Sequence, residues 1–109
     1  MAQYLVQVAY TQEAWASLMH SPQDRSQAVG TAIANLGGKM ENFWLAFGDF
    51  DVVGIIDMPD NVGAASFAMA LAAGGACKSV KTTPLLNLQQ GVEAMKNAAT
   101  CGYKPVSKG

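Results

Sequence analysis

The chain has 109 residues, of which 50% are hydrophobic and only 14% are charged, and its formal net charge is −1. This length suits one hydrophobic core, so a single domain is expected, and so high a hydrophobic content excludes a disordered chain. With no basic patch to neutralise phosphates, no nucleic-acid partner is expected.

The low share of charged residues also bears on assembly. About a quarter of residues are charged in an ordinary globular domain, so a small domain with so few is expected to hide part of its surface in an oligomer. Cys77 and Cys101 are not at metal-ligand spacing, and the first residues lack the pattern of a signal peptide. We therefore expect reduced thiols, a cytoplasmic location and no membrane span.

In chain order, alternating side chains predict a strand over residues 3–10. Thr11 is suited to cap a helix over residues 12–19. Ser21, followed by proline, has the residue type that caps a helix start, which predicts a second helix over residues 22–36 ending at two glycines.

Two strand-like runs then follow, residues 39–47 and 50–58, and Gly48 and Asp49 lie between them. A two-residue loop with glycine first favours a type II′ turn, and such a turn sets the register of the hairpin. In this register one hairpin face is wholly apolar and is predicted to lie in the core. Its members are Phe43, Leu45, Phe47, Phe50, Val52 and Ile56.

Asp60 or Asn61 is expected to cap an alanine-rich helix over residues 62–73. Residues 77–85 have the β-branched content of a strand, and Pro84 places that strand at an edge of the sheet. A final short amphipathic helix, capped by Asn87, is expected next. Its apolar stripe is Leu88, Val92 and Met95.

The order strand-helix-strand-strand-helix-strand predicts an α+β, ferredoxin-like βαββαβ unit followed by a C-terminal helix. Right-handed crossovers give a four-stranded, antiparallel-rich sheet of order 4-1-3-2 with the helices on one face. The opposite face is too apolar to stay in water, so a second copy of the chain is expected to cover it. Residues 1–100 are expected to form one domain and residues 101–109 a C-terminal tail.

Seven short motifs in this order resemble the GYD domain family. They are Tyr4-Leu5-Val6 with Tyr10-Thr11, Pro22-Gln23-Asp24-Arg25, Leu36-Gly37-Gly38, Phe43-Trp44, Phe47-Gly48-Asp49-Phe50-Asp51, Pro59-Asp60-Asn61, and Val80-Lys81-Thr82-Thr83-Pro84-Leu85-Leu86. The resemblance runs from about Tyr4 to Ala99 and implies a ferredoxin-like unit that dimerises into an α/β barrel. It implies little about activity, because related barrels include small monooxygenases, haem-degrading enzymes, isomerases and proteins without a known reaction. The family often has tyrosine where this chain has Phe50.

Five candidate ligand-binding residues are expected on the sheet face without helices. They are Asn42, Trp44 and Asp51 from the hairpin, and Lys81 and Thr83 from the last strand. In the functional interpretation Trp44 stacks on a ligand, Asp51 and Lys81 supply opposite charges, and a desolvated Asp51 serves as a base. In the structural interpretation Asp51 pairs with Lys81 or caps the turn, and Trp44 packs at an interface.

The remaining reactive side chains are isolated. His20 has no second ligand at metal spacing, so neither a metal nor another cofactor is expected. Arg25 either meets an anionic ligand or pairs with a carboxylate of its own fold or of a partner subunit. The sequence thus predicts a homo-oligomeric protein that binds a small molecule at the open sheet face between subunits. The alternatives are an assembly module without a ligand and a cofactor-free monooxygenase or isomerase-like enzyme, and no catalytic residue is indicated.

Overall fold

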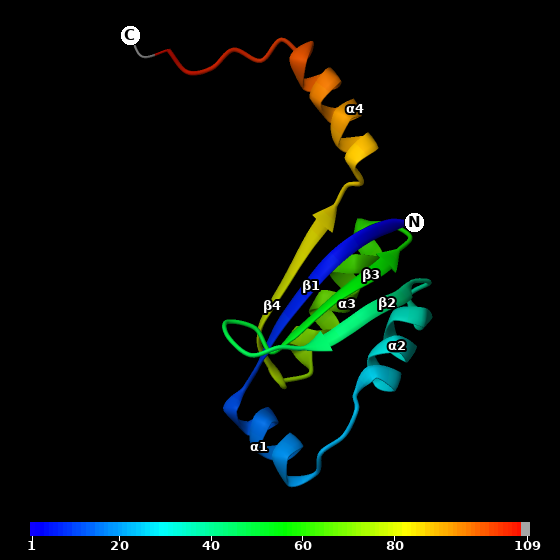
Figure 1. The fold of residues 1–109 in the computed structure, drawn as a ribbon, viewed down its shortest axis with the longest axis vertical. Coiled ribbons are helices and arrows are strands. Elements are labelled where there is room, and N and C mark those ends of the chain that lie inside the picture. Colours follow the sequence, from blue (N-terminus) through cyan, green and yellow to red (C-terminus); the bar gives the residue numbers. More distant parts are fainter. Residues whose placement is uncertain (108–109) are drawn as a thin grey trace.

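The computed structural model describes residues 1–107. Its elements follow the predicted order, with four strands and four helices (Figure 1). They are β1 (Ala2–Tyr10), α1 (Gln12–His20), α2 (Ser26–Asn35), β2 (Lys39–Leu45), β3 (Val52–Met58), α3 (Asn61–Ala73), β4 (Cys77–Leu85) and α4 (Leu88–Ala99).

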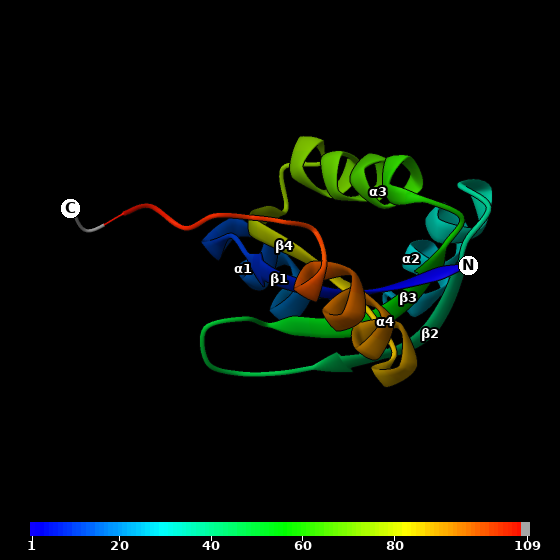
Figure 2. The ribbon, with the colours of Figure 1, turned by 90° about the horizontal axis from the view of Figure 1, so that it is seen from above.

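The four strands form one antiparallel sheet of order β2-β3-β1-β4, so the predicted α+β fold and strand order are confirmed. Helix α2 packs against β2, and α3 packs against β3 and β4. Figure 2 shows α2 and α3 on one side of the sheet; α4, which is drawn in front of the other side in that view, lies beyond the end of the sheet in Figure 1. We call the uncovered side the open face. One row of residues crosses all four strands on this face: Trp44, Val53, Gln7 and Lys81.

The core lies between the sheet and these two helices because alternate strand residues point toward them. Its fully buried members come from β1, α2, β3 and α3. They are Tyr4, Val6, Val8, Ile33, Ile56, Met58, Ala64 and Phe67. The Tyr4 hydroxyl donates a hydrogen bond to Asn61 Oδ1 at 2.6 Å, which ties the start of α3 to the first strand.

The predicted hairpin register is confirmed from Asn42 to Leu45, which pair with Ile55 to Val52. The predicted two-residue loop is wrong, because β2 ends at Leu45, β3 begins at Val52, and residues 46–51 form a wider loop. The Ala46 N–H still donates to the Asp51 carbonyl at 2.7 Å, and the Asp51 N–H donates to the Val8 carbonyl on β1 at 2.8 Å. Strand-like pairing thus reaches this point, and residues 47–50 connect the two sides without a two-residue turn.

Three residues of the predicted apolar core therefore lie outside it, and one of them, Phe50, is half-buried in the loop but not part of the core. Phe47 is 100% exposed in the loop, and Leu45 is 71% exposed at the end of an edge strand. Phe43 and Val52 do pack against the core, and Ile56 lies within it. The prediction failed at the loop end of the hairpin, where Leu45 lines a pocket instead of packing under a helix and Phe47 lies in the loop.

The predicted start of the second helix is also wrong. Ser21 is the C-cap of α1, and α2 begins only at Ser26. The Asp24 carboxylate accepts a hydrogen bond from the Ser26 N–H at 2.8 Å and so takes the first free donor of the helix. Residues 21–25 therefore form an irregular connection whose side chains are free to line a pocket.

The last helix, α4, projects beyond the end of the sheet (Figure 1). Asn87 caps it through the reciprocal hydrogen bonds of a capping box with Gln90. Beyond Ala99 the chain is without helix or strand as far as residue 107, and the last two residues of the predicted tail lie outside the described residues.

Candidate functional site

The candidate ligand residues of the open face lie in two rows across the sheet. One row joins Trp44 on β2 to Lys81 on β4, and the next row joins Asn42 to Thr83. Two strands separate the members of each pair, a distance of about 14 Å at ordinary strand spacing. Within one subunit the structure thus places these residues on one face but does not bring them to one point.

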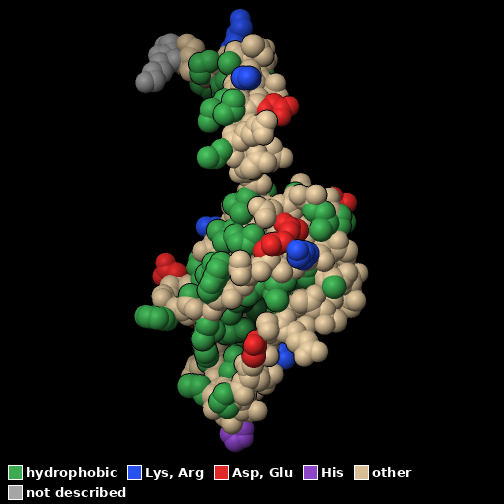
Figure 3. Space-filling model, turned by 45° about the vertical axis from the view of Figure 1, so that its right-hand side comes forward, with side chains coloured by type: hydrophobic (Ala, Val, Ile, Leu, Met, Phe, Trp, Pro, Cys, Tyr) green, Lys and Arg blue, Asp and Glu red, His purple; other side chains and the backbone are tan. Residues whose placement is uncertain are grey.

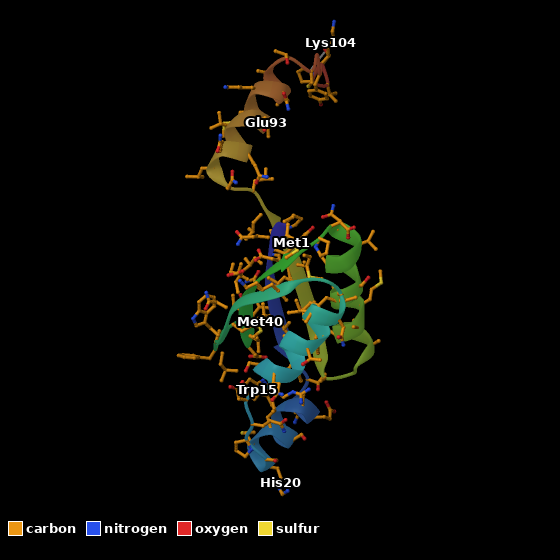
Figure 4. All side chains as sticks on the ribbon, turned by 90° about the vertical axis from the view of Figure 1, so that its right-hand side faces the viewer. Met1, Trp15, His20, Met40, Glu93 and Lys104 are labelled. Atoms are coloured by element: carbon orange, nitrogen blue, oxygen red, sulfur yellow. The ribbon has the colours of Figure 1, made fainter. Side chains whose placement is uncertain are left out.

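Asp51 is occupied by partners of its own chain. Its Oδ2 accepts hydrogen bonds from the Tyr10 N–H at 2.8 Å and from Trp15 Nε1 at 3.2 Å. The Trp15 ring lies edge-on to the Tyr10 ring, with centroids 5.4 Å apart. Figure 4 shows Trp15 where α1 meets the body of the domain and His20 at the free end of α1. The carboxylate therefore anchors α1, and its part in ligand binding stays a prediction.

A pocket of about 310 Å³ lies between α1, α2 and the ends of the central strands. This volume is at the lower end of the range for small-molecule sites. Most of its wall is apolar. The apolar residues are Leu18 of α1, Val29 of α2, Phe43, Trp44 and Leu45 of β2, and Val52 of β3.

The polar part of this pocket comes from residues 23–26 and from Tyr10. Arg25 Nη1 donates a hydrogen bond to Gln23 Oε1 at 3.2 Å. Among residues 1–107 no carboxylate lies within ion-pair distance of Arg25, since the pair Lys39–Glu41 is the only one there. The sequence left two roles open for Arg25, and within the described chain the structure does not provide the carboxylate partner.

Tyr10 is half-buried at the junction of this pocket and a second one of about 210 Å³ on the α1 side. Burial, followed by the nearby Cys77, raises the pKa of the Tyr10 hydroxyl; Arg25 opposes this shift and Asp51 adds to it. The phenol consequently stays protonated at neutral pH. It is a hydrogen-bond donor there and not a base.

The pocket was missed by the sequence analysis because the helix was expected to begin before Arg25. One signal was present in the sequence. Pro22 is followed by Asp24, whose carboxylate accepts from the backbone N–H two residues later, and this pattern is also typical of an irregular segment before a helix. Trp44 is the one predicted ligand residue that lines this pocket.

At the other end of the open face, Glu41 lies beside Asp57. A β-bulge between Met40 and Asn42 places Lys39 opposite Asp57. Hydrogen bonding with Asp57 and repulsion from its charge raise the pKa of Glu41, while Lys39, at 3.6 Å, lowers it. The three charges are at the surface and do not form a ligand cage.

The other reactive side chains remain isolated. Over residues 1–107 no three His, Cys, Asp or Glu side chains come together as metal ligands. Cys77 and Cys101 are free thiols, and burial raises the pKa of Cys77, which keeps it protonated and unreactive. In the same part of the chain no helix is long and apolar enough to cross a membrane.

Fold and pocket together define a ferredoxin-like α+β domain with a cavity on the helix-covered side of its sheet. The chain belongs to the GYD domain family, whose sequence model matches residues 4–99. The resemblance seen in the motifs is thereby confirmed. The comparison with curated proteins finds no match.

Among solved structures the chain is similar to TTHA0845 from Thermus thermophilus, known from a crystal structure. The TM-score is 0.53 and the sequence identity 17%, over 80% of this chain and 95% of that protein. At this identity the likeness supports the fold alone.

Proposed function

We propose that this chain is a homodimeric protein that binds a small organic molecule in the pocket between α1, α2 and β2. The observation that carries the proposal is that pocket, because its wall is mainly apolar and its few polar groups gather on one side. Small-molecule sites combine these two features, which give affinity and orientation respectively.

Assembly is supported by two apolar surfaces that the subunit does not cover. On the open face Leu5, Val53 and Ile55 are only half-buried, and Trp44 is 54% exposed. On α4, Leu88 is 90% exposed and Met95 70%. Figure 3 shows hydrophobic side chains along one side of α4 and, on the same side of the picture, over the body of the domain. A second copy that covers both surfaces removes them from water.

Light scattering of the full chain tests the assembly. We expect a dimer, and we expect Ile55→Lys to raise the dimer dissociation constant tenfold or more because it places a charge within the interface. Ala65→Lys, at an exposed position on the outer side of α3, is the matched control and leaves the dimer intact. If the wild-type chain is monomeric, this part of the proposal is wrong.

Ligand binding is tested with 2-naphthamide, a neutral flat aromatic probe, followed by amide chemical shifts. We expect the shifts to change at Leu18, Val29 and Phe43, and Phe43→Leu to weaken binding about two- to tenfold, since a stacking contact is worth roughly 0.5–1.5 kcal/mol. Met69→Ala, on the exposed side of α3, is the control. Unchanged shifts around the pocket at saturating probe would rule the site out.

The second candidate function is assembly without a ligand, with the open face as a dry interface. The uncovered apolar residues favour it, and so does the structural role of Asp51. The binding hypothesis also has a second form, in which the ligand lies between two subunits at the open face. The residues that would contact it there are Trp44, Asn42, Lys81 and Thr83. The free thiols support a reducing, cytoplasmic setting for either function.

A further inference from the structure

We infer that the pocket between α1, α2 and β2 recognises an organic anion: a flat, mainly apolar molecule that carries one carboxylate. This inference rests on the proposed small-molecule function and adds the chemical class of the ligand. It is carried by the position of an unpaired arginine at one end of a mainly apolar cavity.

The cation is held at the pocket by its own neighbours. Arg25 is the N-cap residue of α2, and the neighbouring Asp24 carboxylate accepts from the N–H of Ser26, the first helical residue, so the backbone at Arg25 is set by the start of the helix. The Gln23 side chain accepts from Arg25 Nη1 at 3.2 Å and donates to the Ser21 carbonyl at 3.4 Å. Gln23 is thus a positioning residue, which limits the directions that the guanidinium can take.

Hydrogen-bond donors dominate the polar side of the pocket. Arg25 has several N–H groups, the Tyr10 phenol stays protonated, and Ser26 adds a hydroxyl. A guanidinium binds a carboxylate through two parallel hydrogen bonds, and an arginine without an internal partner is suited to such a ligand.

The negatively charged Asp24 lines the same pocket and opposes the binding of an anion there. Asp24 is fully exposed to water, and its Oδ1 is occupied by the Ser26 N–H at 2.8 Å. Arg25 is exposed as well, so solvent screens both charges. The guanidinium lies at the edge of an apolar wall and has N–H groups beyond the one that binds Gln23, whereas Asp24 Oδ1 is already occupied. The local balance therefore favours an anion at Arg25.

The apolar wall sets the rest of the ligand. Phe43 and Val52 line it from the helix-covered face of the sheet, and Val29 lines it from α2. A volume of about 310 Å³ accepts a one- or two-ring body and excludes a large cofactor. The chemical class that fits is an aromatic or alicyclic carboxylate, with the ring against Phe43 and the charge at Arg25.

The test compares 2-naphthoate with 2-naphthamide on the full chain, by amide chemical shifts at matched ionic strength. We expect the carboxylate to bind the wild type more tightly than the amide. We expect Arg25→Gln to weaken 2-naphthoate about fivefold or more and to leave 2-naphthamide unchanged. Lys78→Gln removes the same charge from an exposed position outside the pocket and leaves both affinities unchanged.

The outcomes distinguish a failure of the anion preference from a failure of the proposed binding function. If both probes bind in the pocket with equal affinity, or if Arg25→Gln affects them equally, the anion preference is overturned while the binding function stands. If neither probe shifts the pocket residues, the proposed binding function fails and the inference fails with it. Light scattering of Arg25→Gln confirms that the variant keeps the wild-type assembly.

Discussion

At the scale of single residues, Asp51 joins three parts of the molecule. Its backbone N–H donates to Val8 and its carbonyl accepts from the Ala46 N–H at 2.7 Å, while its carboxylate accepts from the Tyr10 N–H and from Trp15 Nε1. Since α1 otherwise packs little on the sheet, the bond to Trp15 is a principal tether of that helix. These hydrogen bonds are those of a residue that positions other elements of the fold.

We predict that Asp51→Ala lowers the free energy of unfolding by about 1–3 kcal/mol, because two donors lose a half-buried acceptor. Asp51→Asn keeps one acceptor oxygen and costs less. In a double-mutant cycle with Trp15→Phe, followed by urea denaturation, the coupling is about 0.5–3 kcal/mol. Strictly additive effects would show that the bond to Trp15 contributes nothing.

At the scale of elements, the hairpin of β2 and β3 depends on one close contact. Gly54 lies opposite Phe43, and a Cβ added at Gly54 would come within 2.6 Å of the Phe43 ring. The aromatic ring thus occupies the space that a side chain at Gly54 would need. This contact seats Phe43 over the strand and leaves it beside the pocket.

Gly54→Ala is therefore expected to destabilise the fold by about 1–3 kcal/mol, since the ring must move within a packed region. Gly30→Ala is the matched control: its Cβ meets only Met40 Cε, at 3.6 Å, and alanine is favoured in a helix. Thermal and urea unfolding of the two variants checks the difference. Equal stabilities would mean that Phe43 has room to move without cost.

At the scale of the whole molecule, the subunit has more apolar surface than its own chain can cover. Helix α4 is the clearest case, because it forms a regular, capped helix that projects from the sheet (Figure 1). A single helix of this length is marginal in water on its own. In the proposed dimer, its stripe of Leu88, Val92 and Met95 would meet a surface of the second copy.

We predict that changing Leu88, Val92 and Met95 together to glutamine leaves the folded domain intact but weakens the dimer at least tenfold. Within one subunit these side chains are largely exposed, so their removal costs little stability there. Gln89→Ala with Lys96→Ala is the control pair. Circular dichroism and light scattering separate the two effects, and an unchanged dimer would place the interface elsewhere.

Much of the fold could be predicted from local patterns. The strand over residues 77–85 was placed at its observed bounds, and Thr11, Asp60 and Asn87 cap helices as their residue types suggest. These features depend on neighbours within a few positions of the chain. The candidate site was harder to predict, because its residues come from β1, the 23–26 segment and β2, and their meeting depends on how α1 and α2 sit against the sheet.

The sequence by itself determined the order of the elements and the register from Asn42 to Leu45. It also determined that the sheet has one helix-covered face and one open face. These features follow from side-chain alternation and turn residues, which act over short distances along the chain. Only the tertiary structure decided that Asp51 turns to β1 and α1, that Phe47 leaves the core, and that Arg25 lies at a pocket without a carboxylate partner in residues 1–107. Each of these depends on competition between distant hydrogen-bond and packing partners, and local sequence does not record which partner prevails.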